Sequence, residues 1–266
     1  MKPRINRPSP FTASVAVLIV VLLGCAGTAG ARGAFNLVSL DQEWGMRNDL
    51  RAQVSQQAQV LDSSYLNTVG RRIAAQTPYG NRRWDFAIVR DNTVNAFNLP
   101  GGLVYVNSGL VAEADTLSEL AGVLAHEIGH GAARHGTQLM TRAYGYNAIA
   151  GLLLGRNPSQ GKQIAAQLLG TGILTNYSRE AEREADRLGV HYTYAAGYDP
   201  EGMVDFYGEM LDMRKRKPTK VEQFFSSHPG TEERIQIIRT EASRLPRRSS
   251  LTTDTNNFQR FRSQFR

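Results

Sequence analysis

The chain has 266 residues, one cysteine and a formal net charge of +7 at pH 7. A single cysteine excludes an intrachain disulfide, and the roughly 240 residues that follow the N-terminal segment fit one domain. The first 24 residues contain three bases and no acids, so a chain that begins at Cys25 has a net charge of +4. The remaining basic clusters, at 214–217 and after Arg244, match no nucleic-acid-binding motif, so nucleic acid is not an expected partner.

Residues 1–24 have the organisation of a secretory signal peptide. Three basic residues precede an apolar run from Ala13 to Leu23, and the run leads into Leu22-Leu23-Gly24-Cys25, a sequence similar to a lipobox. The run is shorter than the roughly 20 residues that a transmembrane helix needs. We therefore predict cleavage before Cys25 and attachment of lipid to this cysteine.

Lipidation of Cys25 predicts a location in the cell envelope. Ala26, rather than an aspartate, favours sorting to the outer membrane of a Gram-negative host, where the anchored protein would face the periplasm. The alternative is ordinary signal cleavage after Ala29-Gly30-Ala31.

The segment from Cys25 to Asn107 predicts a linker, a helix and a small sheet. We expect a linker over 25–45. Residues 46–76 are rich in Gln and Ala with spaced Val, Leu and Ile, which indicates a helix packed before the catalytic core. Short strands are predicted at Trp84 to Arg90 and, on either side of the turn Pro100-Gly101-Gly102, at Val94 to Asn98 and Leu103 to Asn107. The expected fold class is α+β, mainly helical, with a small antiparallel-type sheet beside the active-site helix.

The segment from Thr116 to Ala133 predicts a helix that carries a metal-binding motif. Thr116 and Glu119 form a capping-box pattern, and apolar residues at helical spacing face one core, namely Leu117, Leu120, Leu124 and Ile128. His126 and His130, four residues apart, share the opposite face among small residues, so the helix is expected to be buried on both sides. With Glu127 they form the HExxH pattern of zinc metallopeptidases.

Catalytic zinc sites use three protein ligands, so a third ligand is needed. The segment from Tyr177 to Asp186 has helical spacing and predicts a second helix that begins near Asn176 or Ser178 and stops at Gly197, on which Glu182 and Asp186 lie one turn apart. One carboxylate can bind the metal while the other accepts the free ring N–H of a ligating histidine. Glu180 and Glu184 are rival ligands on the same helix.

The segments outside these two helices predict further helices and a loose end. Apolar pieces between Thr137 and Thr175 are too short to span a membrane, which favours a soluble helical hairpin. Asp199-Pro200-Glu201 begins a helix that runs to about Met213. We place the peptidase domain at 46–245 and expect the basic tail, 246–266, to be disordered.

Four stretches of the sequence resemble the gluzincin metallopeptidases that include the HtpX heat-shock protease, the CAAX prenyl protease and the periplasmic BepA and LoiP proteins. The stretches occur in the family's order, at Asn95–Gly102, Leu124–Gly131, Tyr177–Asp186 and Ser227–Ile235. They cover roughly residues 40 to 240, so the resemblance is specific.

The resemblance implies a role for each matching residue. Glu182 corresponds to the third zinc ligand and Asp186 to the carboxylate that supports a ligating histidine. His228 lies in a segment that the family brings to the metal, where it either fills the open zinc position or steadies the transition state. Arg234 is a candidate for contact with the oxyanion or with a structural carboxylate. Asn95, Ala96 and Phe97 correspond to a sheet edge that pairs with extended substrate.

The expected protein is therefore a zinc endopeptidase with one zinc ion per chain. His126, His130 and Glu182 hold the metal, and Glu127 is the general base. The resemblance implies extended or misfolded cell-envelope proteins as substrates and a role in protein quality control. The alternatives are an outer-membrane assembly chaperone with a latent zinc site and a non-enzymatic lipoprotein with a structural zinc. The sequence does not indicate an oligomeric state.

Overall fold

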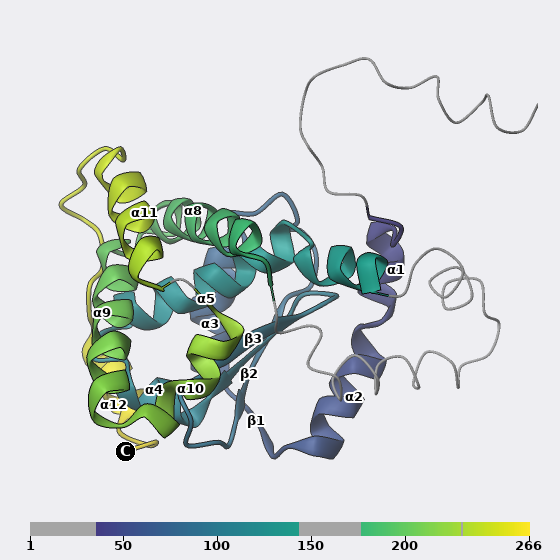
Figure 1. The fold of residues 1–266 in the computed structure, drawn as a ribbon, viewed down its shortest axis with the longest axis horizontal. Coiled ribbons are helices and arrows are strands. Elements are labelled where there is room, and N and C mark those ends of the chain that lie inside the picture. Colours follow the sequence, from purple (N-terminus) through teal and green to yellow (C-terminus); the bar gives the residue numbers. More distant parts are fainter. Residues whose placement is uncertain (1–35, 144–176, 230) are drawn as a thin grey trace, which may run out of the picture. The chain divides into compact units, whose positions relative to one another are not determined.

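A four-stranded sheet with helices on both faces forms the framework of the chain (Figure 1). The computed structural model describes residues 36–143, 177–229 and 231–266. The predicted α+β class is confirmed. The helices and strands, in chain order, are α1 (Leu40–Gly45), α2 (Arg47–Gln57), β1 (Val60–Asp62), α3 (Ser64–Ala74), β2 (Asp85–Val89), β3 (Ala96–Leu99), β4 (Leu103–Asn107), α4 (Ser108–Glu113), α5 (Leu117–Ala132), α8 (Arg179–Ala195), α9 (Glu201–Arg216), α10 (Pro218–Ser227), α11 (Thr231–Ser243) and α12 (Asn256–Arg262).

The sheet is mixed, with the strand order β1-β2-β4-β3. β1 and β3 run antiparallel to their neighbours, but β2 and β4 are parallel. The prediction of an antiparallel-type sheet is therefore wrong for the central pair. The chain passes from β2 to the far edge and forms β3 there. It then turns at Gly101 and Gly102, both of which have positive φ, so that β4 enters beside β2 in the same direction.

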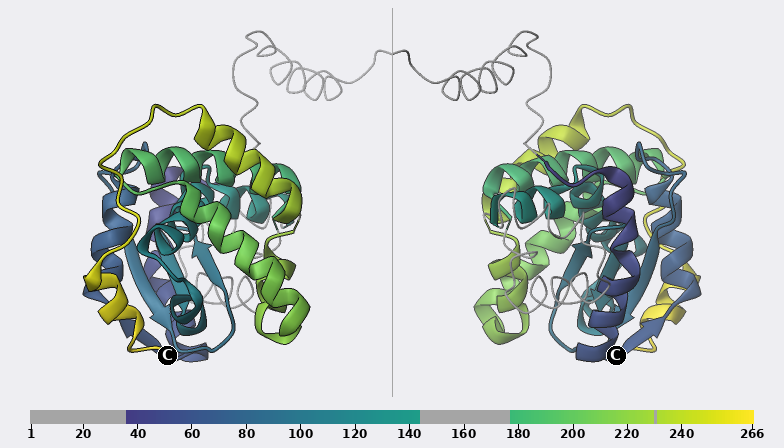
Figure 2. Two further views of the ribbon diagram at one scale, coloured as in Figure 1. Left: turned by 90° about the vertical axis from the view of Figure 1, so that its left-hand side faces the viewer. Right: turned by 90° about the vertical axis from the view of Figure 1, so that its right-hand side faces the viewer.

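The two faces of the sheet are covered by different helices. Along β2, Phe86 and Ile88 belong to the core that contains α3 and α5, whereas Ala87 and Val89 pack with Leu50 and Val54 of α2. This alternation is the period-two pattern of a strand buried on both sides. Figure 2 shows α1 and α2 on one side of the sheet and α5 on the other.

The N-terminal part of the domain is more divided than predicted. The expected helix over 46–76 is wrong in its middle, because β1 separates α2 from α3. Ser63 ends this interruption by accepting a hydrogen bond from the backbone N–H of Leu66 at 3.1 Å, which caps α3. The expected linker over 25–45 is also wrong at its end. There Ser39 and Gln42 form a capping box that begins α1.

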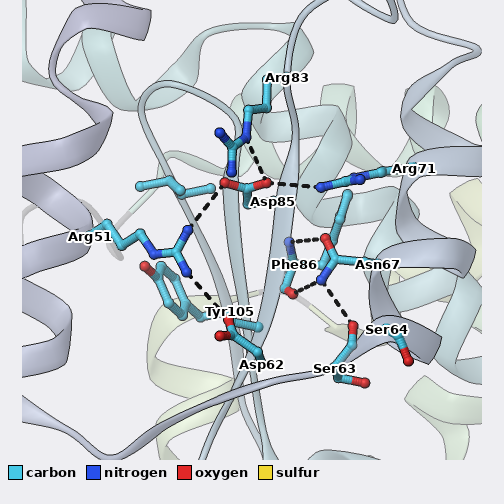
Figure 3. Close-up of a pocket in the computed structure, with 12 residues that line it drawn as sticks. Arg51, Asp62, Ser63, Ser64, Asn67, Arg71, Arg83, Asp85, Phe86 and Tyr105 are labelled. Atoms are coloured by element: carbon cyan, nitrogen blue, oxygen red, sulfur yellow. Dashed lines mark hydrogen bonds and ion pairs between the residues drawn. The ribbon is translucent and has the colours of Figure 1, made fainter.

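Four arginines converge on Asp85 at the start of β2, and Figure 3 shows Arg51, Arg71 and Arg83. Arg51 comes from α2 and Arg71 from α3, with nitrogens 3.5 and 3.1 Å from the carboxylate oxygens. Arg83 lies 3.2 Å away, and Arg47 also contacts the carboxylate. Burial acts to raise the pKa of Asp85, but Arg83, Arg47 and Arg71 hold it below its usual value. One carboxylate thus fastens two helices to the sheet.

Phe86 of β2 lies past the end of β1, and a side chain rather than a strand pairs with its backbone. The amide of Asn67 donates to the carbonyl oxygen of Phe86 at 2.6 Å and accepts from its backbone N–H at 3.2 Å, in the manner of a neighbouring strand (Figure 3). Closing this edge removes a site for unwanted strand pairing. At the opposite side of the sheet, β3 forms the other edge.

The C-terminal tail is ordered, contrary to the prediction for 246–266. Thr255 caps α12, whose Phe258 is fully buried. Arg262 is 5% exposed and donates from Nε to the carbonyl oxygen of Ala112 at 3.0 Å, and it also contacts the Asp115 carboxylate. The tail is polar in composition, but Phe258 and Phe261 lie three residues apart on α12 and bury one face of this helix against the domain.

The remaining predictions concern the helix after Asp199, the segment from Thr137 to Thr175 and membrane spans. The helix after Asp199-Pro200 is confirmed as α9. The predicted hairpin within Thr137 to Thr175 lies mostly outside the described residues, although 135–143 are helical. Every helix in the described part of the chain is too short or too polar to cross a bilayer.

Glu209 on α9 makes the stability of the fold depend on pH. Burial, together with the charges of Glu119 and Asp115, raises its pKa to about 7. A raised carboxyl pKa means that the folded state binds the proton more tightly, so the contribution of Glu209 to stability is greatest at low pH and is lost as pH rises through about 7. We expect Glu209→Gln to have a higher melting temperature than wild type at pH 8, and the difference to shrink towards pH 5.

Asp212→Asn is the matched control for this measurement. Asp212 is exposed on the same helix, and contact with Lys215 lowers its pKa, so it does not titrate between pH 5 and 8. Equal melting temperatures of wild type and Glu209→Gln at pH 8 would contradict the assignment.

Candidate metal centre

Helix α5 carries the two histidines of the motif and is buried along its length. Thr116 caps it by accepting a hydrogen bond from the backbone N–H of Glu119 at 3.3 Å, as the capping-box pattern predicts. Every residue from 117 to 131 is buried. The prediction of a helix covered on both sides is therefore confirmed.

Helix α8 lies against α5 at small residues. Ser178 caps α8 by accepting a hydrogen bond from the backbone N–H of Ala181, the third residue of the helix, at 3.3 Å. A Cβ atom on Gly129 of α5 would lie 2.7 Å from the carbonyl oxygen of Ala185 of α8, so a larger residue would push the helices apart. At this separation, Glu182 and Asp186, one turn apart on α8, reach the histidines of α5.

Four side chains converge at one buried point. One nitrogen or oxygen from each of His126, His130, Glu182 and His228 lies within 4.8 Å of the other three. The Nε2 atoms of His126 and His130 are 3.0 Å apart, and Glu182 Oε1 is 3.3 Å from His130 Nε2. Each of the four residues is at most 3% exposed. The structure thus brings together the three predicted ligands and the predicted fourth residue.

His228 reaches this cluster from the end of α10. Its backbone N–H donates to the carbonyl oxygen of Phe224 at 2.9 Å, and the Phe224 ring packs against the imidazole with centroids 5.4 Å apart. Its Nδ1 atom lies 3.2 Å from Glu182 Oε2 and 3.3 Å from His126 Nε2. His228 is therefore close enough to serve as a fourth ligand.

Asp186 and Arg234 support the cluster from behind His126. Asp186 Oδ1 lies 2.9 Å from His126 Nδ1, the ring nitrogen that a ligating Nε2 leaves free. Arg234 donates to the two Asp186 oxygens at 2.6 and 2.7 Å, and its Nη1 lies 2.7 Å from Glu182 Oε2. Two buried carboxylates therefore occupy the guanidinium, and of the two expected roles of Arg234, contact with a structural carboxylate is the one observed.

The surrounding charges keep Glu182 ionised and favour positive charge at His126. Burial raises the pKa of Glu182, but the positive charges of His228 and Arg234 outweigh it and hold the pKa well below its usual value. Burial and Arg234 lower the pKa of His126, yet hydrogen bonds with Asp186 and Glu182 raise it to about 9. A metal ion at this imidazole would supply the positive charge that the carboxylates favour.

The donor set of the cluster fits zinc. Imidazole nitrogens together with one carboxylate are typical ligands of zinc in hydrolases. Glu182 Oε1 is buried and accepts no hydrogen bond from any described residue. A buried oxygen without a partner costs free energy, and a cation between Glu182 and the histidines would satisfy it. The residues present therefore fit the expected zinc ion.

Glu127 lies beside the cluster. It is 1% exposed, and its Oε1 atom is 3.5 Å from His228 Nε2. Burial raises the pKa of Glu127, and the charges of His228 and His126 offset part of the rise. A higher pKa makes the carboxylate a stronger base, which suits the expected role in proton transfer.

Two residues near the cluster were missed by sequence reasoning, and two rival ligands lie outside it. The side chains of Glu180 and Glu184 are 79% and 60% exposed. His135 lies just past the end of α5, and its Nδ1 atom is 2.9 Å from His130 Nδ1. The ring of Tyr177 stacks on His130 with centroids 4.0 Å apart. His135 follows His130 by five residues, which matches no helical face, so periodicity does not identify it.

The predicted substrate edge lies on and next to β3. Ala96 and Phe97 belong to this strand and Asn95 precedes it. The Asn95 side chain is buried and accepts a hydrogen bond from Ser227 Oγ at 3.3 Å, which ties the segment to the end of α10. The outer edge of β3 pairs with no strand among the described residues. An edge of this kind can bind an extended peptide, so the assignment stays a prediction consistent with the topology.

Comparison with protein families decides the classification. Residues 61–242 match peptidase family M48. The chain belongs to this family. The resemblance noted in the sequence and the class of enzyme, a HExxH metallopeptidase, are thereby confirmed.

Relatives of this M48 chain include proteins from mitochondria and bacteria. The mitochondrial metalloendopeptidase OMA1 of Schizosaccharomyces pombe is 33% identical over 78% of this chain and 63% of its own length. The beta-barrel assembly-enhancing protease of Yersinia pestis is 30% identical over 78% of this chain and 45% of its own length. A putative beta-barrel assembly-enhancing protease of Vibrio cholerae is 34% identical over 69% and 40%, respectively. The chain thus spans 40 to 63% of the lengths of these relatives.

We expect the M48 chain to bind one zinc ion that depends on Glu182. Glu182→Ala should lose the metal, because it removes a buried ligand oxygen. Glu180→Ala is the matched control and should keep the metal, because Glu180 is 79% exposed on the same helix. Metal analysis of the purified proteins checks both. Zinc retained by Glu182→Ala, or lost by Glu180→Ala, would show that the ligand assignment is wrong.

Proposed function

We propose that this chain is a zinc-dependent endopeptidase that cleaves extended or misfolded proteins of the cell envelope, as part of protein quality control. The observation that carries the proposal is the convergence of His126, His130 and Glu182 at one buried point, with the buried carboxylate of Glu127 beside them. A structural zinc site needs no such additional base.

The side chains of the site have separate tasks. His126, His130 and Glu182 would hold the zinc ion. Zinc bound there would supply a Lewis acid that polarises a peptide carbonyl and lowers the pKa of water. Glu127 accepts a proton from the attacking water and returns it to the amine of the leaving peptide. Asp186 accepts the Nδ1–H of His126 and so keeps Nε2 directed at the cluster.

An extended polypeptide is the class of substrate that the position of β3 supports. The strand packs against α5, which carries Glu127, and its outer edge faces away from β4 (Figure 1). Backbone hydrogen bonds to an edge strand do not depend on side chains, so they accept many sequences. The names of the relatives, a metalloendopeptidase and beta-barrel assembly-enhancing proteases, support cleavage of proteins in the envelope.

The position of His228 favours a second candidate function, an outer-membrane assembly chaperone with a latent zinc site. An imidazole in the fourth position would exclude water from the metal. One nitrogen of His228 lies within 4.8 Å of a donor atom of each of the three ligands, which supports this candidate. Cleavage assays separate this candidate from the endopeptidase.

We expect Glu127→Gln to abolish cleavage of unfolded casein while zinc content stays that of wild type. The change removes the base and no ligand, so turnover should fall by about 10²–10⁴-fold. Cleavage by the parent protein should also stop when a chelator removes the metal. Glu180→Gln, at an exposed position, is the control and should remain active.

If wild type is latent, the same comparison is made in a His228→Ala background. If neither zinc-loaded wild type nor zinc-loaded His228→Ala cleaves casein, the endopeptidase is rejected and the chaperone is favoured. Equal cleavage by Glu127→Gln and its parent would reject Glu127 as the base.

We further propose that His228 holds the resting enzyme latent. His228→Ala should then retain zinc and cleave casein faster than wild type, because the fourth position becomes open to water. If His228 instead steadies the transition state, turnover should fall roughly 100-fold or more. His191→Ala, which changes a half-exposed histidine of α8, is the control. A rate equal to that of wild type would reject both roles of His228.

We also propose that a lipid on Cys25 anchors the protein to the outer membrane, facing the periplasm if the host is Gram-negative. The support is the lipobox-like sequence that ends at this cysteine, which lies outside the described residues. Cys25→Ser should abolish labelling by a radioactive fatty acid, whereas Thr28→Ser should not. A mature N-terminus at Arg32 in mass spectrometry would contradict the anchor and support cleavage after Ala31.

A further inference from the structure

A second imidazole lies directly behind a ligand of the proposed zinc site. His135 is 4% exposed, and its Nδ1 atom is 2.9 Å from His130 Nδ1, the nitrogen on the far side of the ring from the cluster. Its other nitrogen, Nε2, lies 3.3 Å from Glu184 Oε2 on α8. The contacts therefore form a chain from His130 through His135 to Glu184.

The protons along this chain can be placed in one consistent way. His130 Nε2, which faces His126 and Glu182, must be unprotonated to bind a metal, so the His130 proton is on Nδ1. His135 Nδ1 then accepts that proton in a hydrogen bond, and its own proton is on Nε2. The Nε2–H donates to the carboxylate of Glu184. Each of these ring nitrogens is then either a donor or an acceptor, and no two donors face each other.

A left-handed backbone conformation at Arg134 positions His135 beside His130. Arg134 has a φ of 61° and is the one non-glycine residue with a positive φ in the described part of the chain. This conformation costs free energy for a residue with a long side chain. The Arg134 guanidinium is held by Glu43, which is 2% exposed, through an Nε–H···Oε2 bond of 2.7 Å. The turn places His135 against His130 directly after α5 ends.

We infer that His135, oriented by Glu184, is a positioning residue for the metal ligand His130. It fixes the proton on His130 Nδ1 and holds the ring so that Nε2 faces the metal. Tyr177, stacked on the His130 ring at 4.0 Å, restrains the same ring through its face. The two ligating histidines thus have different supports, since His126 is held by Asp186 and Arg234. The inference rests on the proposed zinc site.

The test is the zinc affinity of purified variants, measured by competition with a chelating dye. His135→Phe keeps an aromatic ring beside Tyr177 but removes the hydrogen-bond acceptor, and we expect its dissociation constant for zinc to rise at least 10-fold. His135→Gln retains an acceptor and a donor, so it should recover most of the affinity. His191→Phe is the control and should bind zinc as wild type does, because His191 lies on the exposed side of α8.

Glu184→Ala keeps the test decisive if His135→Phe does not fold. It changes an exposed side chain, and we expect a smaller loss of affinity, about threefold, because solvent screens this contact. Circular dichroism of the metal-free proteins reports folding independently of zinc.

Several results would overturn the inference. Zinc affinity equal to that of wild type in folded His135→Phe or in Glu184→Ala would show that the chain of contacts does not support His130. An equal loss in His135→Gln and His135→Phe would show that the residue only fills space. Failure of wild type to bind zinc would instead reject the proposed zinc site itself, so the two failures are distinguishable.

Discussion

The buried guanidinium of Arg234 makes the arrangement of the site possible. Two carboxylates of α8, Glu182 and Asp186, are fully buried, and unpaired charges in such a position would be strongly unfavourable. Arg234 contacts both of them, and its Nη2 also donates to the hydroxyl of Tyr207 at 2.6 Å. Removing one partner of a buried ion pair typically costs about 3–5 kcal/mol. The contact therefore fixes α11 against α8 and α9 as well as supporting the metal ligands.

Close helix packing sets the geometry that this charge network stabilises. Gly129 lets α8 approach α5, and Gly122 has the same role where a Cβ atom would lie 2.9 Å from Met203 Cβ of α9. Ligands from two helices can then meet around one ion, while α10 brings His228 from a third direction. Because the ligands come from separate elements, the site forms only when the whole domain is folded.

Local patterns in the sequence predicted much of this site, and contacts between distant segments account for what they missed. Thr116 and Ser178 act on residues within one helical turn, so their caps were predictable, as was the shared face of His126 and His130. The parallel pairing of β2 with β4 depends on where the chain crosses the sheet, which no local pattern encodes. The same holds for His135, whose position depends on a strained turn at Arg134.

We infer that His126, His130 and Glu182 bind one zinc ion at the point where they converge. Diffraction data collected on either side of the zinc absorption edge, from crystals of the zinc-loaded protein, test it most directly. We expect a single anomalous peak about 2.0–2.2 Å from the ligand atoms of these three residues. A peak elsewhere on the protein, or none at this point, would contradict it.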